Sequence, residues 1–322
     1  MPSELRHLTG NDIHRLLDLD TVARSQREAF TALWRGTVDL PAKIMHASRF
    51  DDSVVFGYLA RLSADTGAIA KIGSVNPGNP SLGLPSVSAL VIVFDPTTGS
   101  PVALLDGAAL TTLRTAAGSA VAIDALARAD ATDLGVLGSG VQARAHVRAI
   151  ARVRPLRTVA VWSPDPARRA RAAAELTAEL GIPVRAADDP KAAVAGLPIV
   201  ATCTLATAPV LDGSWLAPGC TVVSIGSFEP DRAEVDAATV RRAATVVVDD
   251  PATAASHAGP IVTAIAAGAL AVADLVPLGA VLAGDRTGRC AEDDIVFYNS
   301  VGLGIQDAAV AWAAVRAAGA SQ

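Results

Sequence analysis

The chain carries little charge for its length and offers no basic surface. Of its 322 residues, 18% are charged and 51% are apolar, with a mean hydropathy of +0.38. This composition excludes an intrinsically disordered chain and indicates a compact or obligately oligomeric protein. The 27 basic and 32 acidic residues give a net charge of −5, whereas proteins that neutralise nucleic-acid phosphates present clustered positive charge. We therefore expect no nucleic-acid partner.

Cysteines and membrane-directed segments are also scarce. Cys203, Cys220 and Cys290 are odd in number, lie far apart and form no CxxC pair, which argues against a disulfide framework and a structural zinc site. The first twenty residues are charged throughout and lack the apolar core of a secretory signal. Residues 251–273 are uncharged, but their proline, glycine, serine and histidine favour buried soluble chain over a membrane span. A cytoplasmic protein without metal or membrane partners is expected.

Two kinds of pattern divide the chain. From residue 132 onward, β-branched runs alternate with alanine-rich amphipathic stretches, an order that predicts a doubly wound parallel sheet with helices on both faces. The earlier part combines a helical segment over residues 9–35 with several strand-like runs, which indicates an α+β domain. The predicted fold is therefore α/β, with a Rossmann-type domain over residues 119–302. A second, α+β domain for dimerisation and substrate binding is expected over residues 1–118, completed by a C-terminal helix over residues 303–322.

A glycine turn follows the first strand of the predicted parallel sheet. In Gly138-Ser-Gly140-Val141-Gln142-Ala, the first glycine suits a tight turn, and the second lets the backbone approach a pyrophosphate at the start of a helix. This context predicts a dinucleotide site to which Val141 and Gln142 also contribute.

The end of the next strand bears on the choice of cofactor. Ser163 stands where an NAD enzyme would place an acidic residue, and Arg168 and Arg169 follow within a turn. A hydroxyl with nearby guanidinium groups suits a 2′-phosphate, so NADP(H) is favoured. NAD(H) stays open as the alternative, because Asp165 could bond a ribose hydroxyl and the arginines could simply solvate a helix.

Several segments resemble the ornithine cyclodeaminase/mu-crystallin family. The stretch 106–119 contains LRTAA at a fixed distance before the GSGVQA turn, and the segments 94–107, 209–219 and 300–309 match as well. The resemblance covers nearly the whole chain. It implies a homodimer whose first domain, completed by the last helix, forms the dimer interface and covers the cofactor cleft of a Rossmann domain.

Three cations lie within apolar runs, where an unpaired charge is costly to bury. These are Lys43, Lys71 and Arg114. Each one alone could form an internal salt bridge or extend its charge to solvent. The resemblance, however, places all three where the family holds the substrate's α-carboxylate and assists proton transfer. Arg114 is the first choice for the carboxylate, Lys43 stands where the family usually has arginine, and Lys71 is the candidate general acid/base.

The loop after the fifth strand of this domain separates the reductases from the cyclodeaminases of the family. The family's cyclodeaminases carry an aspartate there, and Phe228 occupies its place. Phenylalanine can neither accept a proton nor stabilise an iminium by charge, and the loop resembles that of the reductase branches. Glu229, one position on, leaves cyclodeamination open. Further cofactor contacts are expected at Thr115, Thr202, Cys203, Thr204, Gly226, Ser227 and Val301.

The sequence thus predicts an NAD(P)H-dependent reductase of an imine derived from an α-keto acid, such as a pyrroline or piperideine carboxylate. The same site run in reverse would oxidise an amino acid. A first alternative is an ornithine or lysine cyclodeaminase, which consumes no net NAD(P)H. A second is a cofactor-loaded binding protein without turnover, although a binder of neutral ligands would not need the three cations.

Overall fold

The computed structural model describes residues 5–320, except for the side chain of Pro80, and divides into two compact units. The first unit runs from the N-terminal end to Arg114 and resumes at Leu303, and the second spans Thr115–Gly302. The division between them falls inside the long helix α3 (Gly107–Leu126), close to the boundary expected between residues 118 and 119.

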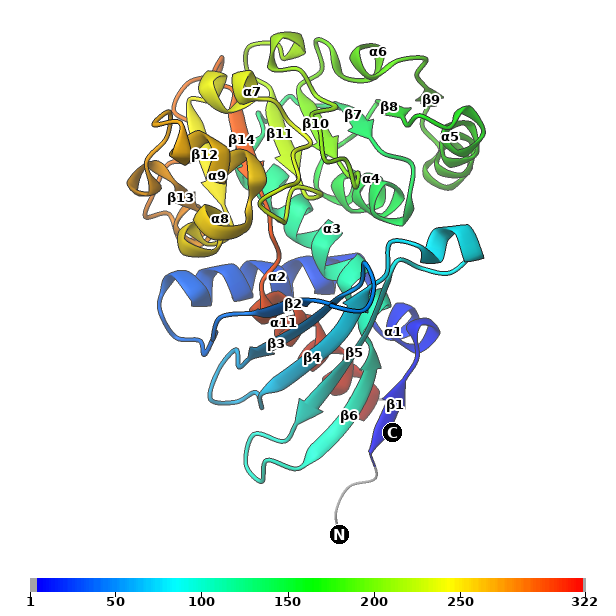
Figure 1. Cartoon of the computed structure of the whole chain (residues 1–322), viewed down its shortest axis with the longest axis vertical. Helices are drawn as coiled ribbons and strands as arrows, with labels where there is room; N and C mark the ends of the chain where they lie inside the picture. Colours follow the sequence, from blue (N-terminus) through cyan, green and yellow to red (C-terminus); the bar gives the residue numbers. More distant parts are fainter. Residues whose placement is uncertain (1–4, 321–322) are drawn as a thin grey trace. The chain divides into compact units, whose positions relative to one another are not determined.

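The first unit is built on a six-stranded sheet (Figure 1). Its strands are β1 (Arg6–Leu8), β2 (Ile44–Ala47), β3 (Val54–Ala60), β4 (Ile69–Val75), β5 (Val87–Phe94) and β6 (Pro101–Asp106). They lie in the order β1-β6-β5-β4-β3-β2, and all neighbours are antiparallel except β1 and β6. Its remaining elements are α1 (Gly10–Leu16), α2 (Leu19–Trp34), the short 3-10 helix η1 (Asn79–Leu82) and α11 (Gly304–Ala320).

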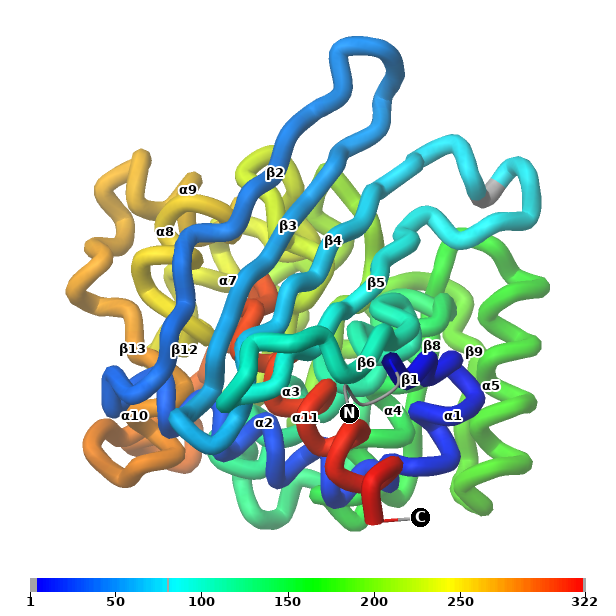
Figure 2. Tube along the Cα trace, turned by 90° about the horizontal axis from the view of Figure 1, so that it is seen from below, coloured from blue at the N-terminus to red at the C-terminus, as the bar shows by residue number. Residues whose placement is uncertain are grey.

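The two faces of this sheet differ. The final helix α11 packs against α2 and strands β3 to β5, and the Trp312 indole donates to the Gly67 carbonyl at 2.8 Å. The other face of the strands, which run side by side in Figure 2, carries the exposed side chains of Ile44, Leu59, Ile72 and Leu90. Strand alternation therefore buries one apolar face and leaves a second apolar face uncovered within the chain.

The prediction of one helical segment over residues 9–35 is wrong in one respect, because this stretch forms two helices, α1 and α2. Thr9 caps the first helix in a reciprocal capping box with Asp12. The chain becomes extended at Leu17, and the Asp18 carboxylate then accepts a hydrogen bond from the Thr21 amide at 2.6 Å to begin α2. Asp18, a second capping residue inside the segment, is the sequence signal that indicates the start of a second helix.

The second unit confirms the predicted parallel sheet. Its strands are β7 (Asp133–Leu137), β8 (Thr158–Trp162), β9 (Val184–Ala186), β10 (Ile199–Thr202), β11 (Thr221–Ser224), β12 (Thr245–Val248), β13 (Val276–Pro277) and β14 (Val296–Asn299). They lie in the order β13-β12-β14-β11-β10-β7-β8-β9, and every neighbouring pair is parallel. The order reverses between β7 and β10, which is the switch point at which such sheets bind nucleotides.

Short helices connect these strands. They are α4 (Val141–Val153), α5 (Pro166–Leu180), α6 (Pro190–Val194), α7 (Ala237–Arg242), α8 (Pro251–His257), α9 (Gly259–Ala266) and α10 (Leu278–Leu282), with the 3-10 turns η2 (Gly213–Trp215) and η3 (Val272–Asp274). The uncharged residues 251–273 lie mainly in α8 and α9. Within the described part of the chain, no helix is long and apolar enough to cross a bilayer.

One buried histidine makes the second unit sensitive to acid. His146 of α4 is fully buried between the Gln142 carbonyl and the Ser119 hydroxyl, at 2.8 and 2.9 Å. Burial lowers the pKa of His146 from 6.5 to about 4. Between these two pH values the unfolded chain binds a proton at His146 that the folded chain does not bind. The free energy of unfolding is therefore unaffected by His146 above pH 6.5 and falls as the pH drops below it.

We expect the protonation of His146 in the unfolded chain to lower the free energy of unfolding by about 3 kcal/mol between pH 7 and pH 4. Urea unfolding at a series of pH values, compared with the same series for His146→Gln, measures this contribution. The variant should be less stable at pH 7 but lose less on acidification. Equal losses in the two proteins would contradict the prediction.

Candidate active site

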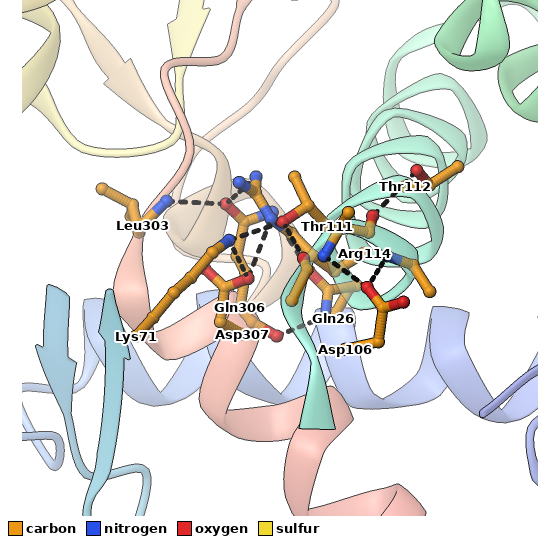
Figure 3. Close-up of polar contacts among 12 residues, drawn as sticks. Gln26, Lys71, Asp106, Thr111, Thr112, Arg114, Leu303, Gln306 and Asp307 are labelled. Atoms are coloured by element: carbon orange, nitrogen blue, oxygen red, sulfur yellow. Dashed lines mark hydrogen bonds and ion pairs between the residues drawn. The ribbon is translucent and has the colours of Figure 1, made fainter. Parts of the chain in front are cut away.

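Lys71 is a buried cation on the inner face of the sheet of the first unit. Strand β4 alternates so that Ile69 and Lys71 point inward while Ile72 is exposed, and Lys71 is only 3% exposed. Its ammonium donates to the Asp307 carboxylate at 2.8 Å and to the Thr111 hydroxyl at 2.5 Å (Figure 3). The ammonium also lies 5.6 Å from the centre of the Tyr58 ring, close enough for a cation–π attraction.

Arg114 shares the same carboxylate. Its Nε lies 3.4 Å from the Asp307 Oδ1, an ion-pair distance without the alignment of a hydrogen bond. One terminal nitrogen donates to the Gln306 side-chain oxygen at 3.5 Å. Gln306 is itself held by the Leu303 amide and by Gln26 of α2. Arg114 therefore reaches the cluster from α3 with its hydrogen-bonding capacity only partly used.

Local sequence explains why these side chains meet. The Asp106 carboxylate accepts from the Ala108 and Ala109 amides and starts α3, which sets Thr111 and Arg114 three residues apart on one helix face. Asp307 lies in the first turn of α11, where the helix dipole favours a negative charge. Figure 3 shows the side chains of β4, α3 and α11 converging on Asp307.

The charge balance of this cluster is its main chemical feature. Two buried basic side chains share one carboxylate, so with Lys71 protonated the group carries one net positive charge, and a buried net charge favours the binding of an anion. Burial and the nearby Arg114 guanidinium lower the pKa of Lys71, while Asp307 opposes the shift. Lys71 is thus tuned toward the range in which an amine can exchange protons.

Lys43, the third predicted cation, is half-buried at the residue before β2. In the order of the sheet, β2 lies two strands from β4. The sequence analysis did not predict Asp307. It stands in the 300–309 segment that carries the family resemblance, and an acidic residue in the first turn of a mainly apolar helix is the signal that could have identified it.

In the second unit, the predicted glycine turn follows β7. Gly138 has a φ of +127°, and a Cβ there would lie 2.5 Å from the Cys203 carbonyl oxygen, so only glycine fits. Gly140 is the N-cap of α4, without a side-chain cap, and Val141 beside it is exposed. The buried side-chain oxygen of Gln142 has no hydrogen-bond partner among residues 5–320. Open amides at this helix start and a spare buried acceptor fit a dinucleotide.

The strand end predicted to read the adenine ribose has mixed features. The Ser163 hydroxyl is buried and lies 2.8 Å from the Ser139 hydroxyl. Asp165 caps α5, its Oδ1 accepting from the Ala167 and Arg168 amides. The Arg169 guanidinium donates to the Ser163 carbonyl at 3.0 Å, whereas Arg168 extends into solvent 3.3 Å from Asp165.

Most of the remaining predicted cofactor residues lie at the strand ends of this unit. Thr202, Thr204, Gly226 and Ser227 all make hydrogen bonds with Glu234, a fully buried residue that sequence reasoning did not single out. The glutamate closes the GSFEPDRAE stretch that begins at Gly226. Cys203 follows β10, and Thr115 begins the part of α3 that belongs to this unit. The buried amide of Val301 donates to the Asp249 carboxylate at 2.9 Å.

The loop of residues 226–234, where the resemblance implies an aspartate in the family's cyclodeaminases, is internally paired. The Arg232 guanidinium lies 5.3 Å from the centre of the Phe228 ring and forms an ion pair with Glu229. Arg232 also donates to the Leu205 carbonyl at 3.1 Å. Glu229 is therefore neutralised by a neighbour of its own loop. In the described part of the chain the three cysteines are free, and no group of acidic, histidine or cysteine side chains could hold a metal ion.

Comparison with known proteins agrees with this architecture. The sequence profile of the ornithine cyclodeaminase/mu-crystallin family matches residues 6–320. The chain belongs to this family. An uncharacterised cyclodeaminase of Sinorhizobium fredii is 36% identical, with 99% of this chain and 97% of that protein covered. Alanine dehydrogenase of Archaeoglobus fulgidus is 32% identical over 94% of this chain and 92% of its own.

Two solved structures are also similar to this chain. Δ1-pyrroline-2-carboxylate reductase of Thermococcus litoralis, in complex with NADH and L-proline, superposes with a TM-score of 0.95 at 30% identity over 98% of both chains. Iminosuccinate reductase of Paracoccus denitrificans, in complex with NAD+, gives 0.90 at 29% identity over 98% of this chain and 97% of that one. The likeness extends over both units.

The tuning of Lys71 by Asp307 can be measured directly. In Asp307→Asn the attraction that raises the pKa of Lys71 is lost while burial and Arg114 remain, so this pKa should fall further. The chain has three lysines, Lys43, Lys71 and Lys191, so 15N resonances of the side-chain amines can be assigned with Lys71→Arg. The control is Asp39→Asn, at an exposed position. An unchanged or higher pKa in Asp307→Asn would disprove the assignment.

Proposed function

We propose that this protein is an NAD(P)H-dependent reductase that converts the imine of an α-keto acid to the α-amino acid, and also runs the reverse oxidation. The observation that carries the proposal is the buried cluster in which Lys71 and Arg114 share Asp307. Its net positive charge suits a substrate carboxylate, and its lysine suits proton exchange with nitrogen. The family includes reductases and dehydrogenases acting on such substrates, as the relatives above are named.

Arg114 is the proposed carboxylate ligand. Its planar guanidinium can hold both oxygens of a carboxylate, and among residues 5–320 its polar contacts are a long hydrogen bond and an unaligned ion pair. Lys43 would add positive charge but not a bidentate grip. Phe228 is the proposed apolar contact for the substrate side chain. A cyclic ketimine such as a pyrroline or piperideine carboxylate matches this combination.

Lys71 is the proposed proton donor. Reduction of a C=N bond adds a hydride to carbon and a proton to nitrogen, and a nicotinamide cofactor supplies the hydride. The lowered pKa of Lys71 lets its ammonium release the proton to the imine nitrogen, and in the reverse direction the neutral amine accepts it. Asp307 keeps the amine in place through both protonation states. Thr111, which donates to the Gly107 carbonyl, remains able to accept from Lys71.

The cyclodeaminase alternative is disfavoured by the loop at residue 228. Phe228 has no acidic group, and Glu229 is already paired with Arg232. The alternative of a binding protein without turnover is disfavoured by the buried cations, which a neutral ligand would not require.

A stoichiometric assay tests the reaction. Δ1-pyrroline-2-carboxylate should consume NADPH or NADH one for one, and ornithine with catalytic NAD+ should release no ammonia. Lys71→Met should reduce imine turnover by about a hundredfold or more, since a positioned general acid contributes about that much, and should leave cofactor binding intact. The matched control is Lys191→Met, on α6 of the other unit. Rapid ammonia release from ornithine would refute the reductase.

The proposed cofactor preference is NADP(H). Support comes from Ser163 at the tip of β8 and from Arg168, whose guanidinium is exposed and lies 3.3 Å from its neighbour Asp165. Arg168→Ala should weaken NADPH binding by about tenfold, the cost of one charged contact to phosphate, and leave NADH unchanged. Fluorescence titration with both nucleotides measures this difference. A wild-type protein that binds NADH more tightly than NADPH would overturn the preference.

Two further proposals concern assembly and location. The exposed apolar face formed by Ile44, Leu59, Ile72 and Leu90 suits a two-fold homodimer, and light scattering that gives a monomer mass at micromolar concentration would contradict it. The dimer of alanine dehydrogenase is a family precedent.

The cytoplasmic location expected from the sequence stays a prediction, which cell fractionation tests.

A further inference from the structure

Glu234 is a fully buried carboxylate without a neighbouring cation. It has no exposed surface, and within residues 5–320 no lysine, arginine or histidine lies within ion-pair distance of it. Burial of an isolated carboxylate is costly, so this one must be stabilised by hydrogen-bond donors.

Five donors from two segments meet that need. The Oε1 atom accepts from the amide and the hydroxyl of Thr204, the latter at 2.8 Å. The Oε2 atom accepts from the Thr202 hydroxyl at 2.8 Å, the Ser224 hydroxyl at 2.8 Å and the Gly226 amide at 2.7 Å. The Glu234 amide in turn donates to the Ser227 hydroxyl at 2.9 Å. The carboxylate thus has its accepting capacity fully used.

These donors occupy one place in the fold. They stand at the carboxyl ends of β10 and β11, which pair in parallel with Thr202 beside Ser224. On its other side β10 pairs with β7, and the Cys203 amide donates to the Leu137 carbonyl just before the glycine turn. The ends held by Glu234 therefore border the nucleotide-binding switch point.

The loop after β11 is fitted closely to this carboxylate. A Cβ on Gly226 would lie 1.9 Å from the Thr204 carbonyl oxygen and 2.6 Å from the Glu234 carboxyl carbon. The two loops and the glutamate are packed without space for a side chain, so a change in the carboxylate must move the loops.

We propose that Glu234 is a positioning residue for the nicotinamide half of the cofactor. A doubly wound sheet binds a dinucleotide as two halves, one over the strands on each side of the switch point. The β7–β8 side carries the glycine turn and Ser163, which leaves the β10–β11 side, held by Glu234, for the nicotinamide. The inference rests on the proposed function, because it assumes a bound nicotinamide cofactor.

Glu234→Gln tests the proposal, because the new amide group would face the donors of Thr204 or Gly226 and displace a loop. The probes are NADPH and 2′,5′-ADP, which contains only the adenine half. We expect the dissociation constant of NADPH to rise about tenfold and that of 2′,5′-ADP to stay within about twofold. The kcat for imine reduction should fall more than the KM for the imine rises, because misplacement of the nicotinamide affects hydride transfer.

Two variants accompany it. Ser224→Ala removes one donor and should shift NADPH binding in the same direction by a smaller factor, which keeps the test decisive if Glu234→Gln does not fold. Asp236→Asn is the matched control: two residues away, it caps α7 and holds the Gly213 amide, and it should change neither ligand selectively.

The outcomes separate the inference from the function on which it rests. Wild-type protein that binds neither NADPH nor NADH would refute the proposed function. Wild-type protein that binds NADPH, with Glu234→Gln and Ser224→Ala equally tight, would refute the positioning role. Equal weakening of NADPH and 2′,5′-ADP would also refute it, because a general loss of structure affects both halves.

Discussion

The first unit depends on one carboxylate that two buried cations share. Asp307 joins β4 through Lys71 and α3 through Arg114 to the first turn of α11. If the carboxylate were absent, two like charges would be buried side by side, which is more costly than either alone. The final helix therefore has an electrostatic as well as an apolar attachment to its sheet. The same arrangement leaves one positive charge uncompensated, so a feature that stabilises the unit also prepares it to bind an anion.

Two buried carboxylates in this chain are stabilised by different means. Asp307 is neutralised by cations whose charge remains partly available, whereas Glu234 is surrounded by backbone amides and hydroxyls that are fully used. The first arrangement tunes a pKa, since Asp307 opposes the effects of burial and Arg114 on Lys71. The second holds the loops after β10 and β11 without a cation near the glycine turn after β7. Charged partners thus surround Lys71, the proposed proton donor, whereas amide and hydroxyl dipoles around Glu234 hold the two loops rigid.

Contacts between polar side chains that lie far apart in the chain could not be predicted from the sequence. The local sequence marks several polar residues as candidate site residues, namely Lys71, Arg114, Thr202 and Thr204. It does not mark their partners in the structure, Asp307 and Glu234. One error was local. The break at Leu17 depends on Asp18, whose capping role the pattern of apolar residues does not reveal. The role of Glu229, which the sequence left open, likewise depends on its ion pair with Arg232.

The sequence by itself determined the alternation of strands and helices, the parallel sheet and the glycine turn at Gly138, because periodicity and turn chemistry act over a few residues. It also indicated that Lys71 and Arg114 required an anion, since both stand in apolar runs. Only the tertiary structure decided that this anion is a side chain 236 residues from Lys71, and that it serves both cations at once. The physical reason is that a buried charge requires a partner within a few ångströms, and packing of distant segments decides which partner lies there.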